Sequence, residues 1–197
     1  MNKEELKKKW ENYWYYYKYH TIAGIFILIL LTVVIQSVIE RVNPDQTVLM
    51  VTNNYVKADD ITLLENCITK YTDDYTGNKK QEVVINSAYL SDNQEYMQLK
   101  IVRELSVWSS FIFITDETEI KYFLDKDLYS DITDIAPNAE NGGKTIKVDT
   151  AKLIGKDTTL PKQIYFGIRT YDQNDKAIAK EAQKAKDTLK KLLDSIK

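Results

Sequence analysis

Residues 21–39 read TIAGIFILILLTVVIQSVI, a run of nineteen residues without a formal charge. A helix of this length spans about 28 Å, which is close to the ~30 Å hydrocarbon core of a bilayer. A helix packed in a soluble core normally keeps a polar stripe, and this run has none. A cleaved signal peptide would have a shorter apolar region followed by small residues, whereas this run leads into Glu40-Arg41. The run therefore predicts an uncleaved transmembrane helix.

The charges that flank this run predict its orientation. Residues 1–20 carry five lysines and three glutamates, whereas Glu40, Arg41 and Asp45 follow the run. Basic residues beside a membrane helix favour the cytoplasmic side. We therefore expect a protein of the cell membrane with its N-terminus in the cytoplasm and its larger C-terminal part outside.

The residues just before the run are rich in tryptophan and tyrosine. Such amphipathic rings suit the headgroup layer of a bilayer, and the lysines around them favour anionic lipids. The alternative is that a partner helix docks on this segment. The predicted membrane-interface residues are Trp10, Tyr13, Trp14, Tyr15, Tyr16, Tyr17 and Tyr19.

The chain is expected to contain four segments. A cytoplasmic basic and aromatic segment (1–20) precedes the transmembrane helix (21–39), and a short linker (40–46) leads to an extracytoplasmic α/β domain (47–197). The last segment has a usual length for one domain. Cys67 is the only cysteine, so no intrachain disulfide can form.

Three short runs in the domain are apolar on successive residues: Val48–Val51, Val83–Ile85 and Phe111–Ile114. Strands of this kind are buried on both faces and are typical of parallel sheets covered by helices. Helical spacing of apolar residues alternates with them. We therefore predict a three-layer α/β domain with a mostly parallel sheet of four to five strands. Further strands are expected at 145–149 and 163–170, and helices from Asp59 or Asp60 to Asp74, from Asp92 or Asn93, from Asp116 to Leu124, and from Asn174 or Asp175.

The sequence lacks the motifs of common catalytic and cofactor sites. It has no P-loop, G-x-S-x-G, H-E-x-x-H or C-x-x-C, and its one histidine, His20, precedes the apolar run. The aspartates at 125, 127, 131 and 134 lack the glycine and glutamate of a calcium loop, so we interpret them as a solvated face. The net charge of -2 argues against nucleic acid as a partner. We expect no metal, no cofactor and no enzymatic activity, although carboxylates alone can hydrolyse glycosides.

A ligand site is predicted where the parallel strands end. Open α/β sheets bind ligands outside the carboxyl ends of their strands. Uncharged hydrogen-bonding groups with two tyrosines would suit a sugar, a peptide or an amide-bearing ligand, whereas the alternative is a set of ordinary capping loops. The candidate residues are Thr52, Asn53, Asn54, Tyr55, Ser87, Tyr89, Thr115 and Asp116.

The stretch from the third strand onward resembles a known family. SFIFITD (110–116), IKYFL (120–124) and LYSDIT (128–133) resemble a segment of the extracellular solute-binding proteins of bacterial ABC importers. In that family a strand leads into an acidic turn, a short helix follows, and a further short segment completes the lobe. QIYFGI (163–168) is similar to the family's Y-G-I-P strand, with Arg169 in place of the proline. The likeness covers about residues 47–170, which is one lobe of a protein that normally closes two lobes on its ligand.

Together these features predict a membrane-anchored binding or interaction module outside the cell, built like one lobe of a solute-binding protein. Its expected partners are the lipid bilayer, a membrane or extracytoplasmic protein, and a small polar ligand. The alternative from another class is a structural or assembly subunit of a membrane complex that works through its transmembrane helix and aromatic residues.

Overall fold

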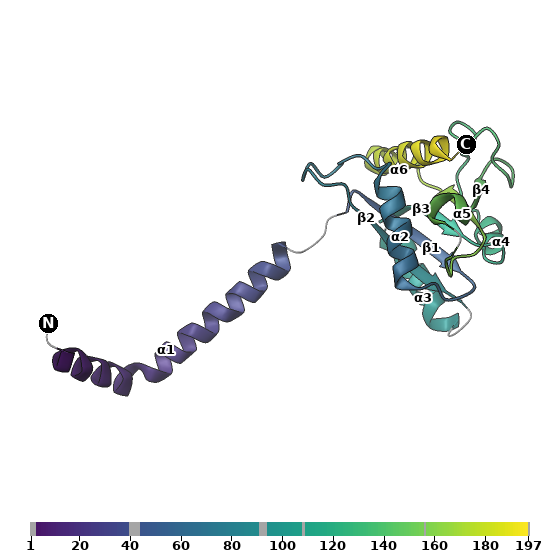
Figure 1. Ribbon diagram of the computed structural model, residues 1–197. Coiled ribbons are helices and arrows are strands. Elements are labelled where there is room, and N and C mark those ends of the chain that lie inside the picture. The colour runs from purple at the N-terminus through teal and green to yellow at the C-terminus, as the bar shows by residue number, and fades with distance from the viewer. Residues whose placement is uncertain (1–2, 40–43, 91–93, 108, 156, 197) are drawn as a thin grey trace. The chain divides into compact units, whose positions relative to one another are not determined.

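The computed structural model describes residues 3–39, 44–90, 94–107, 109–155 and 157–196. The chain forms two compact units, Met1–Asn43 and Pro44–Lys197. The first contains one helix and the second contains the sheet with its covering helices (Figure 1).

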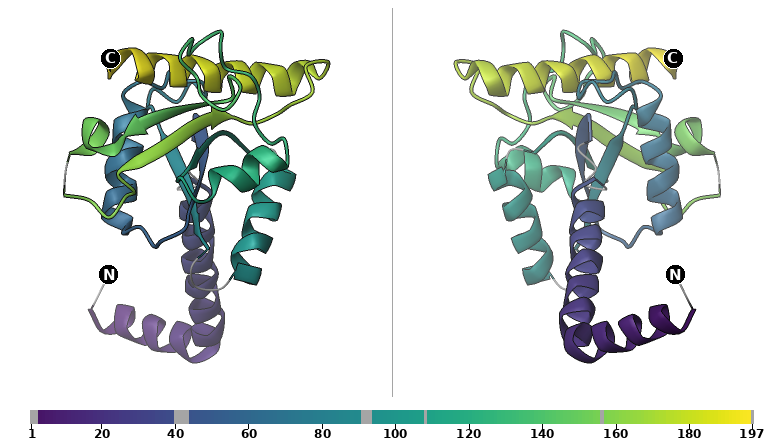
Figure 2. Two further views of the ribbon diagram at one scale, coloured as in Figure 1. Left: turned by 90° about the vertical axis from the view of Figure 1, so that its right-hand side faces the viewer. Right: turned by 90° about the vertical axis from the view of Figure 1, so that its left-hand side faces the viewer.

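The N-terminal unit is a single long helix, α1 (Lys3–Ile39). It is long and apolar enough to cross a membrane, and its apolar window is exposed throughout. The helix extends through the basic and aromatic segment as well as the apolar run, and it bends in its N-terminal half (Figure 2). Trp10, Tyr13, Trp14 and Tyr17 stack along one side, with ring centroids 5.3–6.2 Å apart. These four residues are called the aromatic stack below.

The second unit is built on a five-stranded mixed sheet. Its order is β2-β1-β3-β5-β4, in which β1, β2 and β3 are parallel while β5 runs antiparallel to both β3 and β4. The α/β class is confirmed, but the expectation of a mostly parallel sheet was wrong. A continuous apolar run indicates that a strand is buried on both faces. A central antiparallel strand between two helical layers is buried in the same way, so the run does not indicate the direction of the strand. The strands are β1 (Gln46–Thr52), β2 (Val83–Tyr89), β3 (Ser110–Thr115), β4 (Thr145–Asp149) and β5 (Gln163–Ile168).

Helices cover both faces of the sheet, which makes three layers (Figure 2). The core on one face includes Val48 and Met50 of β1 with side chains of α2 and α6. The core on the other face includes Leu49 and Val51 with side chains of α3 and α4. Alternate residues of one strand thus enter opposite cores, as the two-residue period of a strand requires. The helices are α2 (Ala58–Thr69), α3 (Gln94–Val107), α4 (Ile120–Asp125), α5 (Thr150–Ile154) and α6 (Lys176–Ser195).

The predicted end of a helix is confirmed where a nearby side chain caps that end. Asp175 caps α6, as predicted, by accepting hydrogen bonds from the amides of Ala177 and Ile178. The α2 prediction was wrong at both ends, because the helix begins after Lys57 without a side-chain cap and ends at Thr69. The predicted cap of α3, Asp92 or Asn93, lies outside the described residues. The apolar stripe of α6 packs on the sheet.

The start of the folded unit is held by Asp45. This residue is buried, and its carboxylate accepts hydrogen bonds from the amides of Thr76 (2.7 Å) and Glu82 (3.0 Å). Gln46 then begins β1. The part of the expected linker nearest the domain therefore belongs to the domain's own structure.

Candidate functional site

The carboxyl ends of β1 and β3 lie side by side in the sheet. The helix that follows β1 (α2) covers one face, whereas the helix that follows β3 (α4) covers the other. A crevice at such a switch point is the usual ligand site of open α/β sheets. The amide of Asn53, just after β1, donates a 2.6 Å hydrogen bond to the carboxylate of Asp116, just after β3.

An open cavity of about 520 Å³ lies at this switch point, and it is called the edge cavity below. Its volume is in the range of small-molecule sites. Three of the predicted residues line it, together with the rest of the loop after β3 and one further segment before β5. The lining is Asn53, Asn54, Asp116, Glu117, Thr118, Thr159, Pro161, Lys162 and Gln163.

Asp116 organises the wall of this cavity. Its carboxylate accepts hydrogen bonds from the amides of Asn53 (2.6 Å), Thr118 (3.0 Å) and Glu119 (2.9 Å), and the residue is buried. Three N–H donors leave this carboxylate little capacity for a ligand. Asp116 therefore fixes the two loops relative to each other. It caps the turn that leads into α4, although the helix itself begins later than expected, after Glu119.

Two other predicted residues, Thr52 and Thr115, are buried and hydrogen-bonded within the protein. The hydroxyl of Thr52 donates to the carbonyl of Asn54 (2.8 Å), which shapes the loop after β1. The hydroxyls of Thr115 and Tyr129 lie 2.9 Å apart on the opposite face from α2. Burial raises the pKa of Tyr129 well above its ordinary value.

The remaining predicted residues lie beside the edge cavity and do not line it. The rings of Tyr55 and Tyr89 meet edge to face with centroids 5.3 Å apart. The carbonyl of Ser87 accepts a hydrogen bond from the ammonium of Lys100. The structure thus pairs the two tyrosines with each other and gives the backbone of Ser87 a contact to α3.

The second wall of the edge cavity comes from the segment Thr159–Gln163, which sequence reasoning missed. Because β5 is antiparallel, its first residue lies at the edge where β1 and β3 end. A parallel β5 would have placed this segment at the opposite edge. Lys162 and Gln163 are exposed there, and they add a cation and an amide to the Asn54 and Thr118 side chains.

This segment is held to α2 by one buried carboxylate. Asp60 accepts hydrogen bonds from both the amide and the hydroxyl of Thr159, and the amide of Lys57 donates to the same hydroxyl. Asp60 is 7 % exposed. The two Thr159 hydrogen bonds lower the pKa of Asp60 below its ordinary value of 3.8.

We expect the Asp60→Asn substitution to remove part of the acid sensitivity of folding. A carboxylate with a lowered folded pKa stabilises the protein above its unfolded pKa, and this contribution is lost as the pH falls through the folded pKa. At pH 7 the substitution should cost about 1–3 kcal/mol through the lost charged hydrogen bonds. Urea unfolding of residues 44–197 at pH 7 and at pH 3 measures both effects. An equal cost of the substitution at the two pH values would contradict this role.

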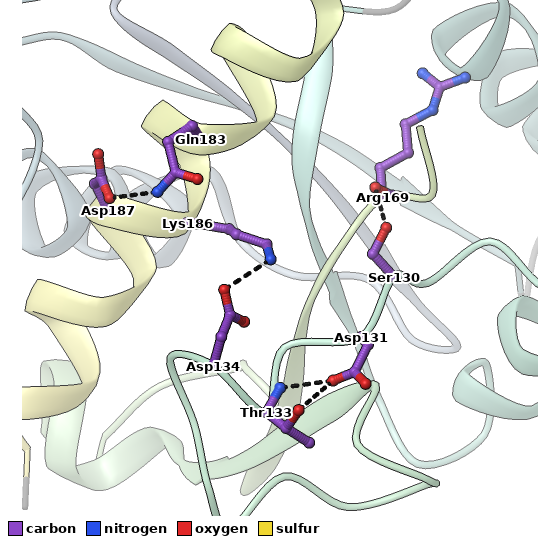
Figure 3. Close-up of polar contacts among 8 residues, drawn as sticks. All are labelled: Ser130, Asp131, Thr133, Asp134, Arg169, Gln183, Lys186 and Asp187. Carbon is purple, nitrogen blue, oxygen red and sulfur yellow. Dashed lines mark hydrogen bonds and ion pairs between the residues drawn. The ribbon is translucent and has the colours of Figure 1, made fainter. Parts of the chain in front are cut away.

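Three of the four aspartates weighed as a calcium loop are engaged separately, and the fourth, Asp125, is exposed at the end of α4. Asp131 accepts hydrogen bonds of 2.7 Å from the amide and hydroxyl of Thr133, and Asp134 pairs with Lys186 of α6 at 2.9 Å (Figure 3). Asp127 pairs with Lys144. Within the described ranges, no three histidine, cysteine or acidic side chains gather as a metal site would need.

Arg169, just after β5, ties this strand to its neighbours. Its amide donates to the carbonyl of Phe111 (2.8 Å), and its own carbonyl accepts the hydroxyl of Ser130 at 3.0 Å (Figure 3). Its guanidinium donates to the carbonyl of Leu105 near the end of α3. Burial lowers the pKa of this guanidinium. A proline has no amide hydrogen and no guanidinium, so it could make neither of the two donor contacts.

No protein-family model, no curated protein and no solved structure matches this chain. The function is therefore argued from the site itself. Hydrogen-bonding side chains around an open cavity can hold a polar ligand or the surface of another protein. The buried Asp116 is already engaged by three amides, whereas Glu117 in the same lining is exposed.

Proposed function

We propose that this chain is a single-pass, membrane-anchored binding module whose α/β domain lies outside the cell. The anchor is α1, which has the length and composition of a membrane-crossing helix. The lysines of residues 1–20 favour the cytoplasm for the N-terminus. The aromatic stack precedes the apolar run and suits the headgroup layer on that side.

The edge cavity carries the binding part of the proposal. It lies at the switch point of the sheet, has a volume of about 520 Å³, and presents the side chains of Asn54, Thr118, Lys162 and Gln163. In the part of the chain that the structure describes, no protein group hydrogen-bonds to these four side chains. Amide, hydroxyl and ammonium groups suit a ligand with carbonyl and hydroxyl groups, such as a peptide or a sugar.

The resemblance to solute-binding proteins supports a binding role of one lobe. The segments that carry this resemblance form, in order, β3, the turn at Asp116, α4 and β5. A solute-binding protein closes a second lobe over the ligand, and the fold described here has one sheet. The open cavity would therefore bind a small ligand weakly, or bind a partner protein that supplies the second wall.

The binding proposal predicts a loss of binding when the cavity loses its free side chains. Residues 44–197, which have their own core, should show a thermal shift with some members of a panel of short peptides, amino acids and sugars. The double variant Asn54→Ala and Thr118→Ala should reduce binding about tenfold or more, because two hydrogen-bonding groups are removed. Gln81→Ala, an exposed change before β2, is the matched control. If the double variant binds as the parent does, the cavity is not the site.

The alternative role, an assembly subunit, is favoured by the aromatic stack. Four stacked rings on a membrane helix offer contact area to a partner helix. In that case residues 44–197 should give no shift with any probe. Detergent pull-down of the full chain should then recover a membrane protein that is lost when the four stacked residues are replaced by leucine.

A further inference from the structure

A second cavity lies between α3 and α4, on the face of the sheet opposite α2. Its volume is about 180 Å³, and it shares no lining residue with the edge cavity. Leu90 follows β2, Glu119 precedes α4, and the other walls come from the two helices. It is called the Glu119 cavity below, and it is lined by Leu90, Gln98, Ile101, Glu119 and Tyr122.

Glu119 is an unusual residue to find in such a wall. It is 8 % exposed, and within the described ranges no side chain or backbone group hydrogen-bonds to its carboxylate. Its oxygens are not among the described polar atoms that are fully buried without a partner, so the carboxylate still faces the open space of the cavity. The pKa of Glu119 is raised, first by its burial and then by the charge of Asp116. The cavity therefore contains a carboxylate that forms no ion pair with a lysine or arginine of the described residues.

The other walls indicate which cation would fit. Leu90 and Ile101 are apolar, and the ring of Tyr122 is partly exposed at the cavity. An aliphatic stem gains from apolar walls, and an ammonium group gains from a carboxylate and an aromatic face. A divalent metal ion would need several oxygen ligands, whereas among the described residues Glu119 is the one carboxylate that lines this cavity.

We propose that the Glu119 cavity binds an alkylammonium group, with the ammonium on the Glu119 carboxylate and its carbon chain between Leu90 and Ile101. The cavity has room for a group the size of a lysine side chain. A free small amine and a lysine of a partner protein share this chemistry. The Glu119 cavity shares no lining residue with the edge cavity and includes no residue of α1. A failure to bind an amine here would therefore not contradict the proposed function.

The test measures binding of n-butylammonium to the full chain in nonionic detergent at pH 7, by isothermal titration calorimetry. n-Butanol, a neutral molecule of the same length, should bind at least about tenfold more weakly if the charge matters. N-acetyl-lysine methylamide, which resembles a lysine within a protein chain, distinguishes a protein lysine from a free amine. Tighter binding of this compound than of n-butylammonium assigns the site to a protein lysine, and the reverse order assigns it to a free amine.

Glu119→Gln should weaken n-butylammonium binding about tenfold or more, because it removes the charge at nearly constant shape. It should change the melting temperature little, since no hydrogen bond or ion pair to this side chain is lost within the described residues. Asp125→Asn, an exposed change at the end of α4 that removes one charge outside both cavity linings, is the matched control and should bind as the parent does.

A second variant keeps the proposal falsifiable if Glu119→Gln does not fold. Gln98 is exposed on α3, and Gln98→Lys places an ammonium of the protein at the cavity. This variant should compete with n-butylammonium and weaken its binding. The proposal is overturned if n-butanol binds as tightly as n-butylammonium, if both variants bind as the parent does, or if neither cation binds.

Discussion

Replacing Gly167 with alanine is expected to lower the free energy of unfolding of residues 44–197 by about 3 kcal/mol, at the upper end of the usual cost of overpacking. Gly167 lies in β5, paired with Phe113 on one side and Thr145 on the other. A Cβ atom there would lie 2.4 Å from Cδ1 and 2.5 Å from Cε1 of Tyr129. The carbonyl oxygen of Lys144 would be 3.1 Å away.

Tyr129 has little freedom to move away from the added methyl group. Its side chain is 1 % exposed, and its hydroxyl is hydrogen-bonded to that of Thr115. Its ring packs against Phe113 and Phe123, with centroids 6.0 Å and 5.8 Å away. The clash must therefore shift either this aromatic cluster or the backbone of β5, and close-packed interiors resist both.

A double-mutant cycle separates this clash from other effects of alanine in a strand. In a Tyr129→Leu background the ring is gone, so Gly167→Ala should cost less than about 1 kcal/mol. Urea unfolding of the four proteins gives the coupling free energy. If Gly167→Ala costs the same in both backgrounds, contact with Tyr129 is not the cause.

Placing two arginines at the centre of the apolar run should release the full chain from the membrane. The double variant Ile29→Arg and Leu30→Arg should cost about 5 kcal/mol or more in insertion, because each arginine at the centre of a membrane helix costs about 2.5–3.5 kcal/mol. Both positions are exposed on α1. Alkaline carbonate extraction of membranes followed by centrifugation measures the retained fraction.

The matched control exchanges the same two side chains without charge. Ile29→Leu with Leu30→Ile keeps the composition of the run, so this variant should stay in the carbonate-washed pellet with the parent chain. If the uncleaved parent chain remains in the supernatant without detergent, α1 is not an anchor. The sidedness and the proposed role would then be withdrawn as well.

Much of the fold was predictable because its signals are local. The apolar run, the buried strand β3 and the cap of α6 at Asp175 each depend on residues close together in sequence. A strand was expected at 145–149, and Ile146 and Val148 of β4 both enter the core shared with α6. Periodicity and capping preferences are sufficient for such features.

The candidate site was predictable only in part. The loops after β1 and β3 could be placed at one edge because parallel strands end together, which brought Asn53, Asn54 and Asp116 to the edge cavity. The second wall could not be placed, since it depends on the direction of β5. The hydrogen bond from Thr159 to Asp60, 99 residues away in sequence, could not be predicted from neighbouring residues either.

The five strands, the apolar helix α1 and the helices α2, α3, α4 and α6 follow from local patterns in the sequence, whereas the short helix α5 was not expected. The three-dimensional structure alone shows that β5 runs antiparallel between β3 and β4, that Gly167 faces Tyr129, and that Glu119 lines a cavity without a hydrogen-bond partner among the described residues. The physical reason is the range of the interactions. Side-chain periodicity is set by neighbours within a few residues, whereas strand direction and cavity walls arise from contacts between segments that the chain keeps far apart.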